Sequence, residues 1–104
     1  MFIFLSHLEV ATDDQMELEG HFRRRSRLVD QFPGFLYLQL LRPQAGAASF
    51  AFLTAWETRE AFAGYMRSKE HSISHSREPA AIMARTDVRH EAFEVLLDSR
   101  REGE

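Results

Sequence analysis

Ser6, Trp56 and His75 are the side chains in this sequence whose types best suit chemistry on a bound molecule. An imidazole ligates metals and carries protons, an indole offers a large flat apolar surface, and a hydroxyl donates or accepts hydrogen bonds. Taken alone, a tryptophan is expected in the core and a histidine in a polar stretch is expected at the surface. Whether the three side chains come together in space depends on the strands and helices that carry them.

Other residue sets point to chemistry less strongly. His71 and His75 would lie on one helical face, as a metal pair does, but no third ligand is evident. Ser6, Ser68 and His75 lack an acid to orient the histidine and a nucleophile elbow, which disfavours a hydrolase. Absence of cysteine excludes disulfides, thiolate metal sites and thiol catalysis.

The basic run at residues 23–27 is expected to be a solvated helix face. It follows two glutamates, and Glu19 and Arg23 have the i,i+4 spacing of a helical ion pair. One or two of its arginines could still meet an acidic group of a ligand. The net charge of −3 gives no general attraction to nucleic acid.

Hydrophobic patterning predicts four strands, at residues 2–10, 35–42, 49–56 and 92–98. Thr12 and Gln15 form a capping-box pattern, and an apolar stripe then predicts a helix to about Gln31, before Pro33-Gly34. Thr58 is expected to cap a second helix over 59–68, with helical continuation possible to Arg77. The segment with Ile82 and Met83 is expected to be less regular.

This order predicts an α+β, ferredoxin-like split β-α-β-β-α-β fold, with both helices on one face of an antiparallel sheet. Three of the strands are apolar on both faces, so the other face also needs a cover. A second copy packed sheet to sheet provides it, and a homodimer is expected. Residues 1–104 are expected to be one domain with a charged, frayed tail at 99–104.

The N-terminal MFIFL is apolar, but His7 and Glu9 interrupt it before a signal peptide or membrane span is complete. We therefore expect no membrane association and a cytoplasmic location. Nine phenylalanines in 104 residues indicate a large aromatic core, an aromatic pocket, or both. Ser6 and Trp56 can share one sheet face with several of them, which suits a flat apolar ligand.

Several patches together resemble a known family. They are Trp56-Glu57, Glu60-Ala61-Phe62, Ser68 and His75, with residues 32–35, 40–43 and 93–98. The chain is similar to the antibiotic biosynthesis monooxygenase superfamily, nearest its bacterial heme-degrading monooxygenases. The resemblance covers nearly the whole chain and implies a dimeric α/β barrel. It supports the fold more firmly than the reaction, since one scaffold hosts several chemistries.

The heme-degrading branch implies three roles. His75 matches a histidine that coordinates heme iron, and Trp56 matches a tryptophan that presses on the porphyrin, with Phe62 expected to contact the ring. Ser6 falls where that branch has an asparagine that hydrogen-bonds oxygen on the iron. A serine is shorter and has one polar atom fewer, so it would need a bridging water. His7 is the alternative residue for that role.

The resemblance therefore implies a protein that binds heme, as substrate and cofactor, and opens the ring. Two alternatives stay open: a cofactor-independent monooxygenase acting on a polycyclic aromatic substrate, and a non-catalytic dimer that binds a small planar hydrophobic ligand. Ser6 favours these alternatives, whereas Trp56 and His75 favour heme. Slow heme turnover is expected for the unaltered chain.

Overall fold

The computed structural model describes residues 1–25 and 27–101. Four strands form one antiparallel sheet in the order β2-β3-β1-β4. They are β1 (Phe2–Glu9), β2 (Phe35–Leu41), β3 (Phe50–Trp56) and β4 (Asp87–Glu94). This strand order, with a helical segment after β1 and another after β3, confirms the ferredoxin-like split βαβ prediction.

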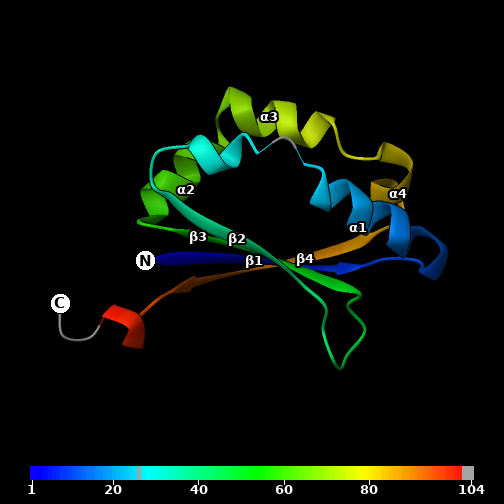
Figure 1. Ribbon diagram of the computed structural model, residues 1–104, viewed down its shortest axis with the longest axis horizontal. Helices are drawn as coiled ribbons and strands as arrows, with labels where there is room; N and C mark the ends of the chain where they lie inside the picture. Colours follow the sequence, from blue (N-terminus) through cyan, green and yellow to red (C-terminus); the bar gives the residue numbers. More distant parts are fainter. Residues whose placement is uncertain (26, 102–104) are drawn as a thin grey trace.

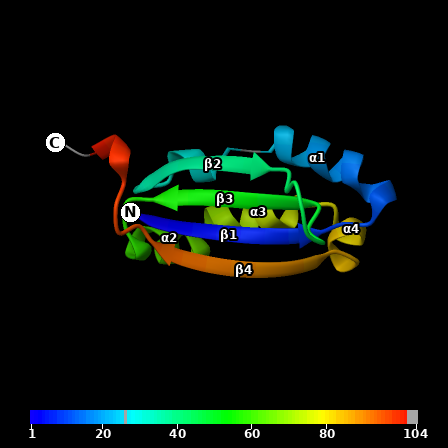
Figure 2. The same ribbon diagram turned by 90° about the horizontal axis from the view of Figure 1, so that it is seen from below.

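The helices of the described residues all lie on one face of the sheet (Figure 1). They are α1 (Gln15–Arg23), α2 (Arg59–Met66), α3 (Lys69–Ser76) and α4 (Ala80–Ala84). Short 3₁₀ turns are η1 (Thr12–Asp14), η2 (Val29–Gln31) and η3 (Ser99–Arg101), of which η3 lies on the other side of the sheet, near the C-terminus. Figure 2 shows the opposite face, which these four helices leave uncovered. None of the helices in the described part of the chain is long and apolar enough to cross a membrane.

Strand alternation divides the apolar side chains between the two faces. Phe2, Phe4, Ser6 and Leu8 of β1 face the helices, as do their partners on β3 and β4. The uncovered face, called here the open face, carries the alternate residues. These are Ile3, Leu5 and His7 on β1, Ala51, Leu53 and Ala55 on β3, Tyr37, Gln39 and Leu41 on β2, and Arg89, Glu91 and Phe93 on β4.

The predicted first helix ends early: α1 stops at Arg23, so its extension to Gln31 is wrong. Leu18 on α1 belongs to one core cluster, with Leu8, Phe50 and Ile82, whereas Val29 belongs to another beside Trp56. Reaching both clusters requires the chain to turn, and Arg27 adopts a left-handed φ of 61° within that turn. Val29 then packs from the short turn η2 instead of from a continued helix.

The second helical region is built from two capped helices. The Thr58 side chain accepts a hydrogen bond from the Ala61 N–H, which confirms the predicted cap of α2. Ser68 accepts from the His71 N–H and starts α3 as a separate helix. Ser68 therefore has a capping role here. The predicted less regular segment contains the short helix α4, which buries Ile82.

The predicted last strand is displaced. Strand β4 runs from Asp87 to Glu94, not over residues 92–98. It is the edge strand beside β1 and carries mainly polar residues, so it lacks the apolar pattern expected of a strand. The apolar Leu96 and Leu97 follow it instead and remain 89% and 72% exposed.

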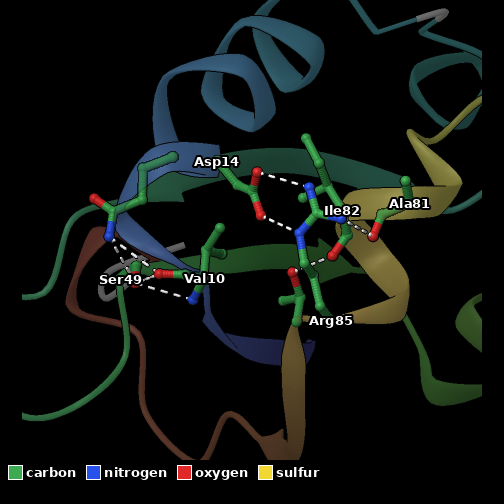
Figure 3. A network of polar contacts seen from close by, with 8 residues as sticks. Val10, Asp14, Ser49, Ala81, Ile82 and Arg85 are labelled. Carbon is green, nitrogen blue, oxygen red and sulfur yellow. Dashed lines mark hydrogen bonds and ion pairs between the residues drawn. The ribbon is translucent and has the colours of Figure 1, made fainter.

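An ion pair between the exposed Arg85 and the buried Asp14 ties the end of α4 to the start of α1 (Figure 3). Asp14 is buried, and Arg85 donates to its two carboxylate oxygens from Nε at 2.6 Å and from a terminal nitrogen at 2.9 Å. The predicted capping box is wrong, because neither η1 nor α1 has a side-chain cap. Gln15 instead donates to the Val10 carbonyl and to the Ser49 hydroxyl, fixing the end of β1.

Asp14→Asn is expected to flatten the acid branch of the stability profile. The hydrogen bond from Arg85 holds the pKa of Asp14 below its ordinary value. The ionised carboxylate therefore stabilises the fold fully at any pH above the ordinary pKa of an aspartate. This contribution is lost as the pH falls through the lower, folded-state pKa, below about pH 4. Melting temperature against pH measures it. Asp13→Asn is the matched control, and parallel acid branches for wild type and Asp14→Asn would contradict the assignment.

Candidate functional site

A cavity of about 410 Å³ lies between the sheet and the helices. This volume is in the range of small-molecule sites, roughly 300–1,000 Å³. Phe4, Phe52 and Trp56 line it from the sheet, and Phe62 and Tyr65 line it from α2. The cavity wall is therefore largely aromatic and suits a flat apolar molecule.

Trp56 closes β3 and is 1% exposed. Its ring meets Phe35 and Phe62 edge to face, with centroids 5.3 and 5.8 Å away, and its indole N–H donates to the Thr54 hydroxyl at 2.9 Å. Trp56 lines the cavity and is also part of the second core cluster. The core and ligand-contact interpretations of this residue are thus compatible.

Ser6 lies on the helix-covered face with Phe52 as its β3 partner, and it lines the cavity. Its hydroxyl is 2.9 Å from Nδ1 of His90, the opposite residue on β4. His7, the alternative for the asparagine role, points to the open face and pairs with Glu91 at 2.6 Å. His7 therefore does not reach the cavity, and that alternative is wrong.

His75 lines the cavity from α3, and its side chain is 69% exposed. Among the described residues, its side chain has one polar contact, from Nδ1 to a Glu78 carboxylate oxygen at 3.3 Å, so the ring is loosely held. His71 lies one turn earlier with its ring edge-on to Tyr65 at 5.2 Å. Burial and the neighbouring His75 lower the pKa of His71, whose ring also bonds to the Met66 backbone.

Phe62 is placed at the centre of the aromatic wall. Its ring centroid is 4.5 Å from that of Phe4 and 5.1 Å from that of Phe2, in addition to its contact with Trp56. These contacts connect α2 to the sheet. The side chain expected to touch a planar ligand is therefore rigidly held beside the cavity.

Two arginines of the basic run line the cavity, in line with the alternative that one or two of them could meet an acidic group of a ligand. Arg23 pairs with Glu19 at 3.0 Å on α1, as its spacing predicted, but α1 ends there. Arg25 and Arg27 follow the break and reach the cavity wall, with Ser26 outside the described residues. A wholly solvated face is therefore the wrong interpretation of this run.

Arg25 has an unusual environment for an exposed-loop cation. One terminal nitrogen lies 3.2 Å from each carboxylate oxygen of Asp30, whereas Nε is buried and has no hydrogen-bond partner among the described residues. A buried N–H without a partner costs free energy unless a ligand supplies an acceptor. The cavity wall thus offers a cation with unused hydrogen-bonding capacity.

Four of the five histidines line this cavity: His21, His71, His75 and His90. Within residues 1–25 and 27–101, no group of three or more His, Cys, Asp or Glu side chains is arranged to hold a metal ion. An iron that already has four porphyrin nitrogens needs only one protein ligand, and a single imidazole meets that need.

The antibiotic biosynthesis monooxygenase family matches residues 1–76. The heme oxygenase (mycobilin-producing) of Mycobacterium tuberculosis is 34% identical over 96 residues, 90% of this chain and 88% of that protein. The heme-degrader MhuD from M. tuberculosis, solved with two hemes in its active site, has a TM-score of 0.79 at 29% identity, covering 94% of this chain and 98% of that chain.

SnoaB from Streptomyces nogalater, a cofactor-independent oxygenase, has a TM-score of 0.72 at 21% identity, covering 93% of this chain and 94% of that chain. That likeness concerns the fold. The family match extends over all of β1 to β3 and over α2 and α3, which carry Ser6, Trp56, Phe62 and His75. The chain belongs to the antibiotic biosynthesis monooxygenase family.

Proposed function

We propose that the protein binds heme between its sheet and its helices and opens the porphyrin ring oxidatively, with heme as both substrate and cofactor. One observation carries the proposal: an aromatic cavity of about 410 Å³ with an available imidazole, in a chain 34% identical to a mycobacterial heme oxygenase. The proposal is for a monooxygenase of the heme-degrading type.

His75 is the residue that holds the iron in this proposal. Its ring lines the cavity from α3 and, among the described residues, is held loosely by Glu78 and the His71 ring, so it can turn toward a bound ring. Trp56 and Phe62 contact the porphyrin and exclude water from it, because both belong to the packed aromatic wall. Bound heme supplies the redox-active metal that activates oxygen.

Arg25→Ala is expected to weaken hemin binding by roughly tenfold or more, the usual value of a charge-assisted hydrogen bond. Arg25 offers its buried Nε and its charge to a propionate of the ring. Arg23→Ala is the matched control, since Arg23 pairs with Glu19 on α1 and does not line the cavity. Equal dissociation constants for the two variants, measured by absorption titration, would exclude this contact.

Single-turnover decay of the heme absorption tests the proposed activity. Each oxygen insertion consumes one O₂, two electrons and two protons, so one oxygen atom enters the ring and the other leaves as water. The electrons require an external reductant. Hemin-loaded protein with ascorbate and catalase should lose its Soret band and form an open-chain product, at a slow rate because Ser6 replaces an amide. An unchanged spectrum over hours would contradict the proposal.

A cofactor-independent monooxygenase is the second candidate, because the aromatic wall also suits a polycyclic phenol. Oxygen consumption with such a phenol and without heme would favour it. A ligand-binding protein without activity would bind hemin or a phenol and consume no oxygen with either. Heme absorption and oxygen consumption, measured with and without each ligand, thus distinguish all three functions.

We propose that two copies form a homodimer through the open face, which completes a dimeric α/β barrel. Ile3, Leu5 and Leu53 give this face an apolar centre. Leu96 and Leu97 extend from its margin with most of their surface exposed, which is costly in an isolated chain. A second copy would bury both features.

Leu53→Glu is expected to convert the dimer to a monomer of about 12 kDa. Leu53 lies between Leu5 and Gln39 at the centre of the open face, so a carboxylate there would be buried without a partner in the dimer. Light scattering after size-exclusion chromatography measures the mass. Met16→Glu, on the exposed side of α1, should leave the mass unchanged. A wild-type monomer at micromolar concentration would contradict the dimer.

We also propose the cytoplasm as the location, since a chain without cysteine suits a reducing compartment. Fractionation of cells that express the protein tests this. Recovery in the secreted or membrane fraction would contradict it.

A further inference from the structure

Ser6 and His90 form a polar pair within the otherwise aromatic sheet side of the cavity. The two residues are opposite each other in the β1–β4 register, and Ser6 Oγ lies 2.9 Å from His90 Nδ1. The imidazole also stacks on the Phe4 ring, with centroids 5.1 Å apart and an interplanar angle of 29°. Stacking and hydrogen bond together fix the ring, so the pair is an ordered feature of the cavity.

The direction of this hydrogen bond depends on the tautomer of His90. No other acceptor for the Ser6 hydroxyl is found among the described residues, which favours the hydroxyl as the donor and Nδ1 as the acceptor. A neutral imidazole that accepts at Nδ1 carries its proton on Nε2. His90 therefore presents an N–H donor, and Nε2 has no partner within the described part of the chain.

This donor and His75 line the cavity from opposite layers of the fold. Ser6 and His90 line the cavity from the sheet, whereas His71 and His75 line it from α3 in the helix layer. A flat ligand between the layers has one face toward each set. If His75 held a metal in that ligand, the pair of Ser6 and His90 would lie on the opposite side of the ligand from His75.

We infer that His90, fixed by Ser6, is the hydrogen-bond donor to the small molecule that binds the heme iron on the sheet side, dioxygen in the reaction. This inference rests on the proposed function. Ser6 is then a positioning residue whose hydroxyl acts through His90. Neither residue is required to hold the iron.

The tautomer is tested first, in the protein without heme. Nitrogen–proton correlation spectra of the imidazoles should show the Nε2–H form for His90 in wild type and a mixture of tautomers in Ser6→Ala. A dominant Nδ1–H form in wild type would overturn the inference whether or not heme binds. This readout is therefore independent of the proposed function.

Fluoride binding to the ferric heme complex tests the donor itself, because bound fluoride accepts hydrogen bonds. His90→Leu should weaken fluoride binding roughly tenfold while the hemin complex still forms, and Ser6→Ala should weaken it less. His90→Gln should restore most of the affinity, since an amide also donates. His7→Gln, one residue from Ser6 but on the open face, is the matched control and should have no effect.

Three results would overturn the inference. Fluoride affinity of His90→Leu within twofold of wild type would exclude a donor role. Loss of the hemin complex in His90→Leu, with retention in His75→Ala, would make His90 the iron ligand. Failure of wild type to bind hemin would overturn the proposed function as well, and only that result affects both.

Discussion

His75→Ala is expected to abolish the Soret shift that hemin undergoes in wild-type protein, whereas His71→Ala retains it. The two imidazoles are 5.8 Å apart on α3, but their environments differ. His71 is partly buried, packs edge-on to Tyr65 and bonds to the Met66 backbone. His75 is exposed, and among the described residues its side chain has only loose contacts, with Glu78 and with the His71 ring. Only His75 can turn into the cavity without loss of packing.

Circular dichroism and thermal melting of both variants exclude unfolding as the cause. His75 is at the exposed end of a capped helix, so its truncation should change stability by less than about 0.5 kcal/mol. The reverse result, loss of the shift in His71→Ala alone, would move the iron ligand one turn along α3. A shift retained in both variants would leave His21 or His90 as the ligand.

Trp56→Ala is expected to lower the free energy of unfolding by about 3–5 kcal/mol, the usual cost of truncating a buried large aromatic residue. Trp56 is 1% exposed and packs against Phe35, Phe62 and Tyr65 at the junction of β3 and α2. A domain of this size typically has 5–15 kcal/mol of stability, so the loss is a large share. Urea titration followed by far-ultraviolet circular dichroism measures it.

Trp56→Phe is the control that separates packing from ligand contact. It keeps an aromatic ring but loses the hydrogen bond to Thr54, so a smaller loss of stability is expected. Because the folded variant still presents a ring to the cavity, hemin binding should persist. A loss below about 1 kcal/mol for Trp56→Ala would show that the indole is not part of the core.

The parts of the fold that local patterns specify were predictable. The strands at residues 2–9, 35–41 and 50–56 have dense apolar runs, and Thr58 has the sequence pattern of a cap. Pro33-Gly34 marked the turn before β2, where Gly34 has a φ of +85°. A Cβ at Gly34 would lie 2.5 Å from the Ala61 Cβ, so this turn also sets how closely α2 approaches.

The parts that depend on tertiary contacts were not predictable. Val29 continued the apolar stripe of α1, but it serves a different core cluster, and only the packed structure separates the two. Strand β4 is an edge strand whose alternation is polar, and the apolar residues after it gave a stronger but wrong signal. Hydrophobic periodicity identifies strands by their apolar residues, so it cannot find an edge strand whose residues are mainly polar.

Some residues of the candidate site were predictable from the sequence, and others depend on tertiary contacts. Ser6, Trp56, Phe62 and His75 were identified from type and from resemblance, and the structure brings all four to one cavity. His90 was missed because the last strand was displaced, which removed its register with Ser6. Arg25 could not be singled out within the basic run, because the predicted helix extended through the whole run and placed it on a solvated face. Correct strand limits would have placed His90 opposite Ser6.

Titration of wild-type protein with hemin, followed at once by the Soret band and by tryptophan fluorescence, tests the central claim most directly. Trp56 is the only tryptophan, and it lines the cavity, so heme bound in the cavity must quench its emission. Heme bound there should quench the emission in parallel with the Soret shift, and both should saturate together. A Soret shift with unchanged Trp56 emission, or no change in either signal, would contradict heme binding between the sheet and the helices.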